Sequence, residues 1–433
     1  MTPLGWVGIV RLGLVQSAIG AIVMLATSLL NRVMVVEYAL PAALPAGLVA
    51  WHYAVQLSRP VWGHGSDRGR RRTPWIVGGM AVLATGAIAA VLSLGLLATR
   101  SLAGFAAAAA AFAMIGAGVG AAGTSLLALL ATRVAPARRA AAASITWIMM
   151  VAGIVITARI AGSLLDPFSL PRLVRVASGV ALVAFVVAAL AVRGIEGVTA
   201  ALPPERALSS QPLKAELATM WADREARRFT VFVFLSMLAY SMQDLILEPF
   251  AGLLFGFTVG QSTQLSGVQH GGVLLGMILV GVGGNAFGGR SARDLRVWIV
   301  AGCIGSAAAL AGLALAARSG PGWPLAANVA ALGFANGLFA VAAIGAMMAL
   351  AGQDRGREGI RMGVWGAAQA IAFGLGGLTG AVAVDIGRSL IGSTPQTFAM
   401  VFGAEALLFL AAASLWLRGP ARMSVQTTVS AAA

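Results

Sequence analysis

The sequence has little of what a soluble protein or a metalloenzyme needs. Cys303 is the single cysteine among 433 residues, so neither an intrachain disulfide nor a cysteine-based metal site can form. Charged residues make up 10% of the chain, against about 25% in soluble domains, and hydrophobic residues make up 59%. This composition disfavours a soluble fold and predicts an integral membrane protein.

Acidic residues are also scarce, and their scatter argues against catalysis. The chain has 15 of them, and they do not form the two Asp-rich clusters with which membrane prenyltransferases hold magnesium diphosphate. A P-loop and a nucleophile–base–acid set are missing as well. We therefore predict no catalytic residues and no enzymatic activity.

The basic residues outnumber the acids by 15, but their distribution does not indicate nucleic-acid binding. They lie in short clusters between apolar runs, which is the pattern of cytoplasmic loops in membrane proteins. If both termini are cytoplasmic, 22 of the 30 fall on the inner side and six on the outer side. The sequence thus predicts a multi-pass membrane protein with both termini in the cytoplasm.

Long apolar runs predict an all-α membrane protein with twelve spans, because about 20 apolar residues cross a bilayer as a helix. The expected helices cover residues 9–31, 41–61, 75–98, 104–132, 141–165, 173–193, 229–256, 264–287, 297–317, 325–350, 362–384 and 395–417.

The twelve spans divide into two similar sets. A polar stretch, 194–228, separates a six-helix half at 1–193 from a six-helix half with a short tail at 229–433. Basic loops recur at equivalent places, 62–74 and 288–296. Six plus six helices around a long cytoplasmic linker is the plan of the major facilitator fold, in which substrates bind between the halves.

Two carboxylates lie inside the apolar run from Phe229 to Phe257. Asp244 and Glu248 are one helical turn apart in Gln243-Asp-Leu-Ile-Leu-Glu-Pro-Phe250. A charge near the middle of a bilayer costs about 2.5–3.5 kcal/mol on insertion scales, so such groups face a partner, a cavity or a ligand. We expect the protein to bind or move something inside the membrane.

Other polar residues in the spans are candidates with open alternatives. Asn31 and Arg32 end the first predicted helix, and Arg32 could pair with Glu37, serve the two acids or anchor to lipid headgroups. His270, next to two glycines, and His52 could be axial ligands to the magnesium of a chlorin, or hydrogen-bonded packing residues. Small residues from Gly363 to Gly377 favour close helix packing or a groove for a flat ligand.

The loop after the second predicted helix resembles the gating motif of major facilitators. The matching residues are Gly63, Asp67 and Arg68, followed by Arg70, Arg71 and Arg72. An acid at a helix end and arginines that bridge neighbouring helices would suit a cytoplasmic gate. The alternative is a loop that only sets the topology.

Four stretches together resemble the PucC family, the bacteriochlorophyll-delivery branch of the major facilitator superfamily. They are Asn31-Arg32-Val-Met-Val-Val-Glu37, Gln243-Asp-x-x-Leu-Glu-Pro-x-x-Gly252, Phe255-Gly256 with Gly260 and Thr263, and Gly366-Ala-Ala-Gln369-Ala370. The size is similar to that of the smaller members, which are labelled a chain of bacteriochlorophyll synthase.

The resemblance implies a carrier or assembly factor of the bacterial inner membrane that binds bacteriochlorophyll, or a precursor, as its ligand. Polar contacts to the pigment would come from Gln243, Asp244, Glu248, Gln369, Asn31 and Arg32. The implied partners are the lipid membrane, a bacteriochlorophyll synthase and antenna or reaction-centre polypeptides. Two alternatives remain: a proton-coupled transporter of a small amphipathic solute, in which Asp244 or Glu248 carries the proton, and a non-transporting scaffold.

Overall fold

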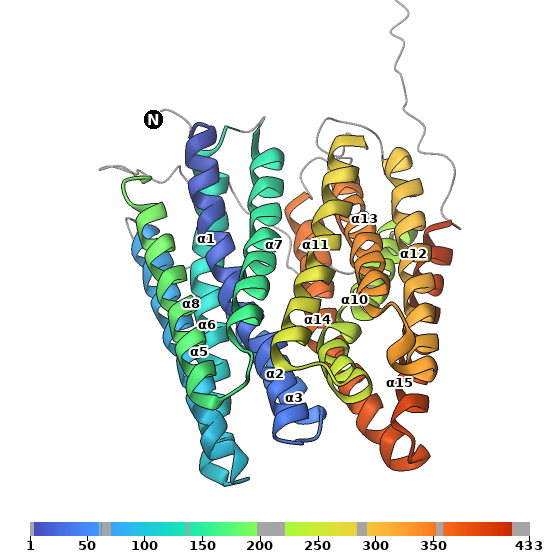
Figure 1. Ribbon diagram of the computed structural model, residues 1–433. Coiled ribbons are helices and arrows are strands. Elements are labelled where there is room, and N and C mark those ends of the chain that lie inside the picture. Colours follow the sequence, from blue (N-terminus) through green and yellow to red (C-terminus); the bar gives the residue numbers. More distant parts are fainter. Residues whose placement is uncertain are drawn as a thin grey trace, which may run out of the picture.

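A computed structural model describes residues 4–59, 62, 71–135, 138–196, 221–283, 292–351 and 358–417. These residues are helical with short connections and contain no strand (Figure 1). The long helices are α1 (Trp6–Met24), α3 (Ala43–Gln56), α5 (Thr73–Ala98), α6 (Leu102–Arg133), α7 (Arg139–Leu164), α8 (Leu170–Val192), α10 (Arg224–Phe255), α11 (Val259–Gly283), α12 (Ala292–Ser319), α13 (Leu325–Ala351), α14 (Glu358–Ile391) and α15 (Thr394–Leu417).

Ten of the helical segments are long and apolar enough to cross a membrane, so the chain is a multi-pass membrane protein. The two predicted spans outside these ten are the second and the eighth, which correspond to α3 and α11. Helix α11 carries several amides, hydroxyls and His270, and α3 carries His52 and Gln56. Both contribute side chains to a polar cavity described below, and α3 has only 14 residues, fewer than a full span needs.

The first helix is longer than predicted. It continues past residue 31 through η1 (Leu25–Leu29), α2 (Leu30–Arg32) and η2 (Val33–Glu37). The charges at Arg32 and Glu37 suggested a helix end at the membrane surface, but the two side chains pair at 2.6 Å and Arg32 is 2% exposed. η1 and η2 are π-helical turns on either side of Asn31 and Arg32; such turns are frequent at functional sites.

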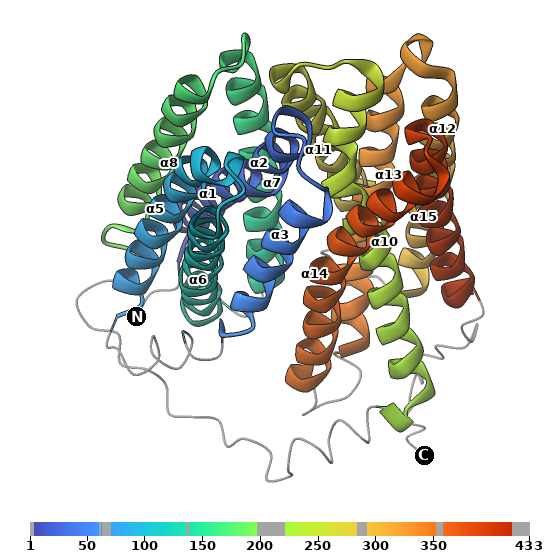
Figure 2. The ribbon, with the colours of Figure 1, turned by 90° about the horizontal axis from the view of Figure 1, so that it is seen from below.

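The helices form two groups that meet along one face. Figure 1 shows α1, α5, α6, α7 and α8 on one side and α10–α15 on the other. Seen from below in Figure 2, α3 lies next to α14, and α7 next to α11, where the groups meet. The buried apolar residues follow the same division, with one core cluster mainly within residues 9–195 and another mainly within 226–413.

Small residues let the helices of each group pack closely. A Cβ at Gly118 of α6 would come within 2.5 Å of the backbone nitrogen of Leu83 in α5. In the glycine-rich α14, a Cβ at Gly377 would come within 2.5 Å of Leu245 of α10. For this part of the stripe, the structure therefore favours the close-packing interpretation.

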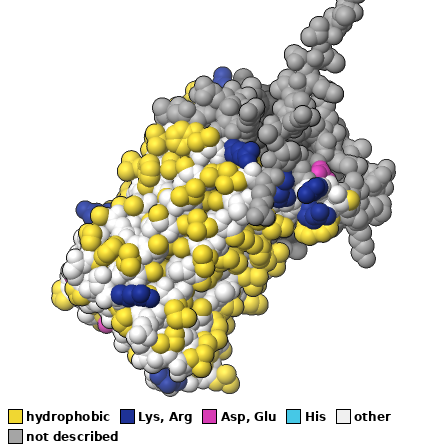
Figure 3. All heavy atoms as spheres, turned by 90° about the vertical axis from the view of Figure 1, so that its right-hand side faces the viewer, with side chains coloured by type: hydrophobic (Ala, Val, Ile, Leu, Met, Phe, Trp, Pro, Cys, Tyr) yellow, Lys and Arg dark blue, Asp and Glu magenta, His cyan; other side chains and the backbone are white. Residues whose placement is uncertain are grey.

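The outer surface suits a lipid environment. In Figure 3, the face formed by the second group is dominated by hydrophobic and uncharged side chains, and charged ones are sparse. Leu407, Leu410 and Met400 of α15 are among the large apolar side chains exposed on the molecule.

Candidate functional site

The contact between Asn31 and α10 depends on a proline in α10. Pro249 lies inside α10 and has no N–H to donate to the carbonyl of Leu245, four residues earlier. Asn31 Nδ2 donates to this oxygen instead, at 2.6 Å. Asn31 is 1% exposed, so two of the four stretches that suggested the PucC family are joined by a buried hydrogen bond between the helix groups.

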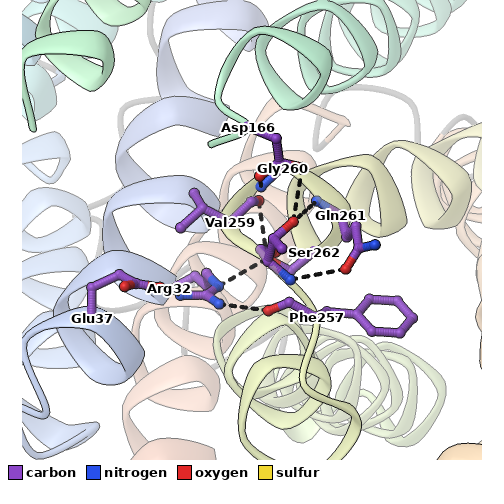
Figure 4. Close-up of polar contacts among 9 residues, drawn as sticks. Arg32, Glu37, Asp166, Phe257, Val259, Gly260, Gln261 and Ser262 are labelled. Atoms are coloured by element: carbon purple, nitrogen blue, oxygen red, sulfur yellow. Dashed lines mark hydrogen bonds and ion pairs between the residues drawn. The ribbon is translucent and has the colours of Figure 1, made fainter. Parts of the chain in front are cut away.

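Arg32 makes three further contacts (Figure 4). Its Nη1 pairs with Glu37 Oε1 at 2.6 Å, while Nε donates to Ser262 Oγ at 2.9 Å and Nη2 donates to the Phe257 carbonyl at 2.8 Å. Of the three roles considered for Arg32, the pairing with Glu37 is confirmed, and the anchor at lipid headgroups is wrong because the side chain is buried.

Three glycines make room for these contacts. A Cβ at Gly252 would lie 3.1 Å from Arg32 Nη2, and a Cβ at Gly260 would lie 2.3 Å from Asp166 Oδ2. Gly256 ends α10 with a φ of 68°, which favours glycine, and so turns the Phe257 carbonyl toward Arg32. These glycines belong to the stretches that resemble the PucC family. Gly252 and Gly260 leave space for the side chains of Arg32 and Asp166, which explains why glycine stands at these positions.

Two acids cap helices of the opposite group. Asp166, just after α7, accepts the Gly260 N–H at 3.2 Å and the Thr258 hydroxyl at 2.8 Å, at the start of α11. Asp385 of α14 accepts the N–H groups of Ala42 and Ala43 at 3.0 and 2.7 Å, at the start of α3. Each acid lies on or just after the fifth span of its own group and caps the second span of the other group. The two contacts are therefore equivalent under the repeat that relates the two groups.

The hydrogen bonds between the groups thus concentrate at one end of the molecule. They involve residues at 31–43, 166, 245–262 and 385, whereas α1 and α10 begin at the other end (Figure 1). We call these contacts the polar seam. The polar seam closes the molecule at the end remote from the N-terminus.

Glu248 lies at the inner side of the polar seam. It is 2% exposed, and neither carboxylate oxygen has a hydrogen-bond partner of good geometry in the described part of the chain. The hydroxyls of Ser28 and Ser266, which are 3.2 Å apart, and the charge of Arg32 are the polar groups around it. A buried carboxylate without a firm partner is costly, which marks Glu248 as a candidate for proton or ligand binding.

Asp244 lines a cavity of about 60 Å³ between the groups. The carboxylate is half-buried and accepts a long hydrogen bond of 3.5 Å from Gln269 Nε2. Polar side chains from both groups share this cavity, namely Thr27, Ser28, Tyr53, Ser241, Asp244, Gln269 and His270. A space of this size holds water or a small ion and is far below the roughly 300–1,000 Å³ of sites for larger ligands.

The two histidines are placed differently. His270 lines the cavity, and its Nδ1–H donates to the Ser266 carbonyl at 2.9 Å, which leaves Nε2 as the basic nitrogen. His52 is 2% exposed and its Nε2 contacts Gln56 at 2.8 Å. Axial ligation of magnesium by either residue stays a prediction, and the cavity beside His270 has no room for a macrocycle in this conformation.

The other predicted ligands lie apart from the cavity lining. Gln243 is fully buried in α10, and its amide has no hydrogen-bond partner among the described residues. Gln369 of α14 makes a weak 3.8 Å contact with Met237 Sδ. Their role as pigment ligands stays a prediction, while Asn31 and Arg32 have structural contacts that a ligand would have to replace.

Most of the predicted gating loop lies outside the described residues. This applies to Gly63, Asp67 and Arg68, whereas Arg71 and Arg72 are described. Glu196 accepts the Arg72 N–H at 2.5 Å and the Thr73 N–H at 2.8 Å, and so caps the start of α5. Whether the loop acts as a gate stays a prediction.

Sequence reasoning missed the partners that complete the site. It gave no role to Asp166, Asp385, Glu196, Ser28 or Ser266. Asp166 and Asp385 could have been found from the repeat, since both follow the fifth span of a half. The serines carry no signal, because a hydroxyl in a membrane helix usually bonds to its own backbone.

Comparison with known proteins gives close and distant relatives. The chain is 52% identical, over 95% of each chain, to the "Bacteriochlorophyll synthase 44.5 kDa chain" of Rhodobacter capsulatus. It is 32% identical to "Protein PucC" of the same organism, over 93% of this chain and 90% of the relative. These relatives fit a protein of the bacterial inner membrane.

Solved structures with the same arrangement of helices are transporters. A peptide transporter in complex with sulfate matches with a TM-score of 0.69 at 14% identity, covering 96% of both chains. The nucleoside transporter NupG matches with a TM-score of 0.69 at 10% identity, covering 94% of this chain and 99% of the other. At such low identity the likeness shows the fold alone, which is the all-α major facilitator fold predicted from the sequence.

A family model described as "PUCC protein" matches residues 29–419, which begin just before Asn31 and include the whole polar seam. The family match, the relative at 52% identity and the facilitator fold agree, and the chain belongs to the PucC family.

Proposed function

We propose that this protein binds bacteriochlorophyll, or a late precursor, in the membrane and delivers it to light-harvesting or other photosynthetic complexes. The relative at 52% identity is named after bacteriochlorophyll, and the chain belongs to the PucC family. A facilitator fold adds two helix groups that can move against each other. The role is that of a carrier or assembly factor in the inner membrane.

The observation that carries the proposal is the convergence of the PucC-like stretches on the polar seam. Residues from α2, α10 and the start of α11 meet there, and Glu248 lies beside them without a firm partner. A rigid scaffold has no need for an unpaired carboxylate between two helix groups. A protein that changes contacts between its halves does, because the acid can exchange partners as the halves move.

The carrier role does not include catalysis. Prenyl transfer requires two magnesium-binding Asp-rich clusters, and the 15 scattered acids of the sequence do not supply them. The name of the relative is compatible with a subunit that works next to a synthase. The partners in this proposal are a bacteriochlorophyll synthase and antenna or reaction-centre polypeptides.

Deletion of the gene in a pigment-making host tests the proposal. We expect loss of pigmented antenna or photosynthetic complexes while the free pigment is still made, and rescue by the wild-type gene. Glu248→Gln should rescue poorly, whereas Arg159→Gln, at an exposed position on α7, should rescue fully. Unchanged complexes in the deletion strain would refute the role, and full rescue by Glu248→Gln would favour the scaffold.

A proton-coupled transporter of a small amphipathic solute is the second candidate. It is favoured by Glu248 and by the polar cavity at Asp244, whose volume of about 60 Å³ suits water or an ion. Purified protein in vesicles would then take up protons together with a solute, and Asp244→Asn would abolish this coupled movement. Proton uptake that needs no solute, or that survives the substitution, would count against it.

A further inference from the structure

A space large enough for the proposed ligand lies outside the polar seam. A groove of about 900 Å³ runs between α7 and α8, and α1 forms its floor. Figure 1 shows α1 between these two helices; α1 packs against both, whereas α7 and α8 scarcely touch each other. The volume lies at the upper end of the roughly 300–1,000 Å³ found for ligand sites.

The groove is long and open to lipid. Its residues on α8 run from Arg172 to Val187, which is roughly 20 Å at 1.5 Å per residue. Ile156 and Ile160 of α7 and Val183 of α8 line it and are each more than half exposed. About 900 Å³ over this length gives a cross-section of roughly 45 Å², which is broader than one extended hydrocarbon chain.

The floor and the ends of the groove differ in chemistry. Gly153 of α7 packs against the backbone of Ser17 of α1, and Ala18 and Ala21 line the groove beside this contact, which keeps the floor low. At the end near the polar seam, Arg172 and Arg175 line the groove. Arg172 is held by its Nη1, which donates to the Pro167 carbonyl at 2.8 Å, and Arg175 is exposed.

We infer that this groove, which we call the lateral groove, is the site where the pigment binds, an assignment that rests on the proposed function. A tetrapyrrole with an isoprenoid ester is a flat apolar body with a long tail and carbonyl oxygens at its edge. The small residues offer a flat floor, the length of α8 takes the tail, and the guanidinium groups of Arg172 and Arg175 donate to the carbonyl oxygens. The opening lets the pigment enter from the bilayer without crossing it.

In this assignment the pigment binds in the lateral groove and not in the polar cavity. The cavity at Asp244 is about 60 Å³ and cannot hold a macrocycle, whereas the lateral groove is about 900 Å³. Asp166 lines the lateral groove and also caps α11, so one residue connects the groove with the polar seam. The seam then controls the shape of the groove, and the pigment never needs to pass between the halves.

Gly179 provides a test that leaves the fold intact. A Cβ at this position of α8 meets no atom within 4 Å, although the residue lines the groove. Gly179→Phe should fill the groove, while Gly179→Ala should not. Gly95 of α5 is also exposed, also has no atom within 4 Å of its Cβ and lies outside the groove, so Gly95→Phe is the matched control.

The measurement is the amount of tetrapyrrole that copurifies with the full-length protein from a pigment-making host. We expect Gly179→Phe to lower pigment per protein by roughly tenfold, and by more than Gly179→Ala does, with Gly95→Phe close to wild type. Joint replacement of Arg172 and Arg175 by Gln should also lower it, and Arg159→Gln should not. Elution volume in size-exclusion chromatography checks that each variant is folded.

Three results would overturn the assignment. Wild-type pigment content in Gly179→Phe would place the pigment elsewhere and leave the proposed function standing. Loss of a copurifying phospholipid, but not of pigment, would make the lateral groove a lipid site. A wild-type protein that carries no pigment at all would refute the assignment together with the proposed function.

Discussion

At the scale of single residues, the hydrogen bond from Asn31 to the Leu245 carbonyl, which Pro249 leaves without a donor, explains why two distant stretches of the chain belong together. The proline removes a backbone donor in α10, and the amide from the other helix group replaces it at 2.6 Å. The proline therefore leaves the Leu245 carbonyl free to accept a hydrogen bond from the first helix.

Replacement of Asn31 by Ala should destabilise the protein by about 1–3 kcal/mol, because it leaves a buried carbonyl without a donor. Thermal unfolding in detergent measures this loss. Pro249→Ala restores an N–H four residues after Leu245, so Asn31→Ala should cost much less in a Pro249→Ala background. Equal costs in the two backgrounds would show that the Asn31–Leu245 hydrogen bond does not stabilise the fold.

The sequence identified some of these residues but not their contacts. Asp244, Glu248, Asn31 and Arg32 stood out because polar groups are costly in an apolar span. Asn31 bonds to a backbone carbonyl, Arg32 to a serine hydroxyl and a loop carbonyl, and Asp244 weakly to an amide, and none of these partners has a recognisable pattern. Arg32 and Glu37 misled the prediction of the helix end, because a buried ion pair looks like a polar terminus until the pairing is known.

At the scale of elements, the reciprocal caps by Asp166 and Asp385 link the start of α11 and the start of α3 to the opposite group. A carboxylate that accepts N–H groups at a helix start stabilises the helix and favours the observed arrangement. These caps hold the molecule closed at the end with the polar seam.

Joint replacement of Asp166 and Asp385 by Ala should weaken this closure, by about 0.5–2 kcal/mol for each cap. Thr27 lines the polar cavity, so a single cysteine introduced there reports on this closure. The protein for this experiment carries Thr27→Cys and Cys303→Ala. A membrane-impermeant thiol reagent should then label Thr27→Cys faster from the side of the polar seam. An unchanged labelling rate from that side would mean that the caps do not control closure.

Element order and fold class followed from the apolar runs, whereas the capping did not. The order of the twelve predicted spans agrees with the helices, although α10 begins at Arg224 rather than at residue 229. That helix starts in a basic stretch, where hydropathy is a poor guide to the end of a helix. The lateral groove left no signal either, because the α1 residues on its floor, Leu14, Ser17, Ala18 and Ala21, resemble those of any packed membrane helix.

At the scale of the whole molecule, the distribution of basic residues predicts that both termini lie in the cytoplasm. A fluorescent protein that folds only in the cytoplasm should be bright when fused after residue 417. The same fusion after Arg100 or after Ser319, in outer loops, should be dark, and a periplasmic phosphatase should show the opposite pattern. A dark fusion after residue 417 would reverse the orientation and place the polar seam on the cytoplasmic side.

As a whole, the molecule has a pigment-sized groove on one helix group and a polar seam that joins the two groups, and we propose that it carries pigment in the membrane. The most direct test of this proposal is the absorption spectrum of the wild-type protein, purified from a pigment-making host in mild detergent. We predict a bound tetrapyrrole in near-stoichiometric amount that stays with the protein through size-exclusion chromatography. A colourless protein from fully pigmented membranes would contradict the account.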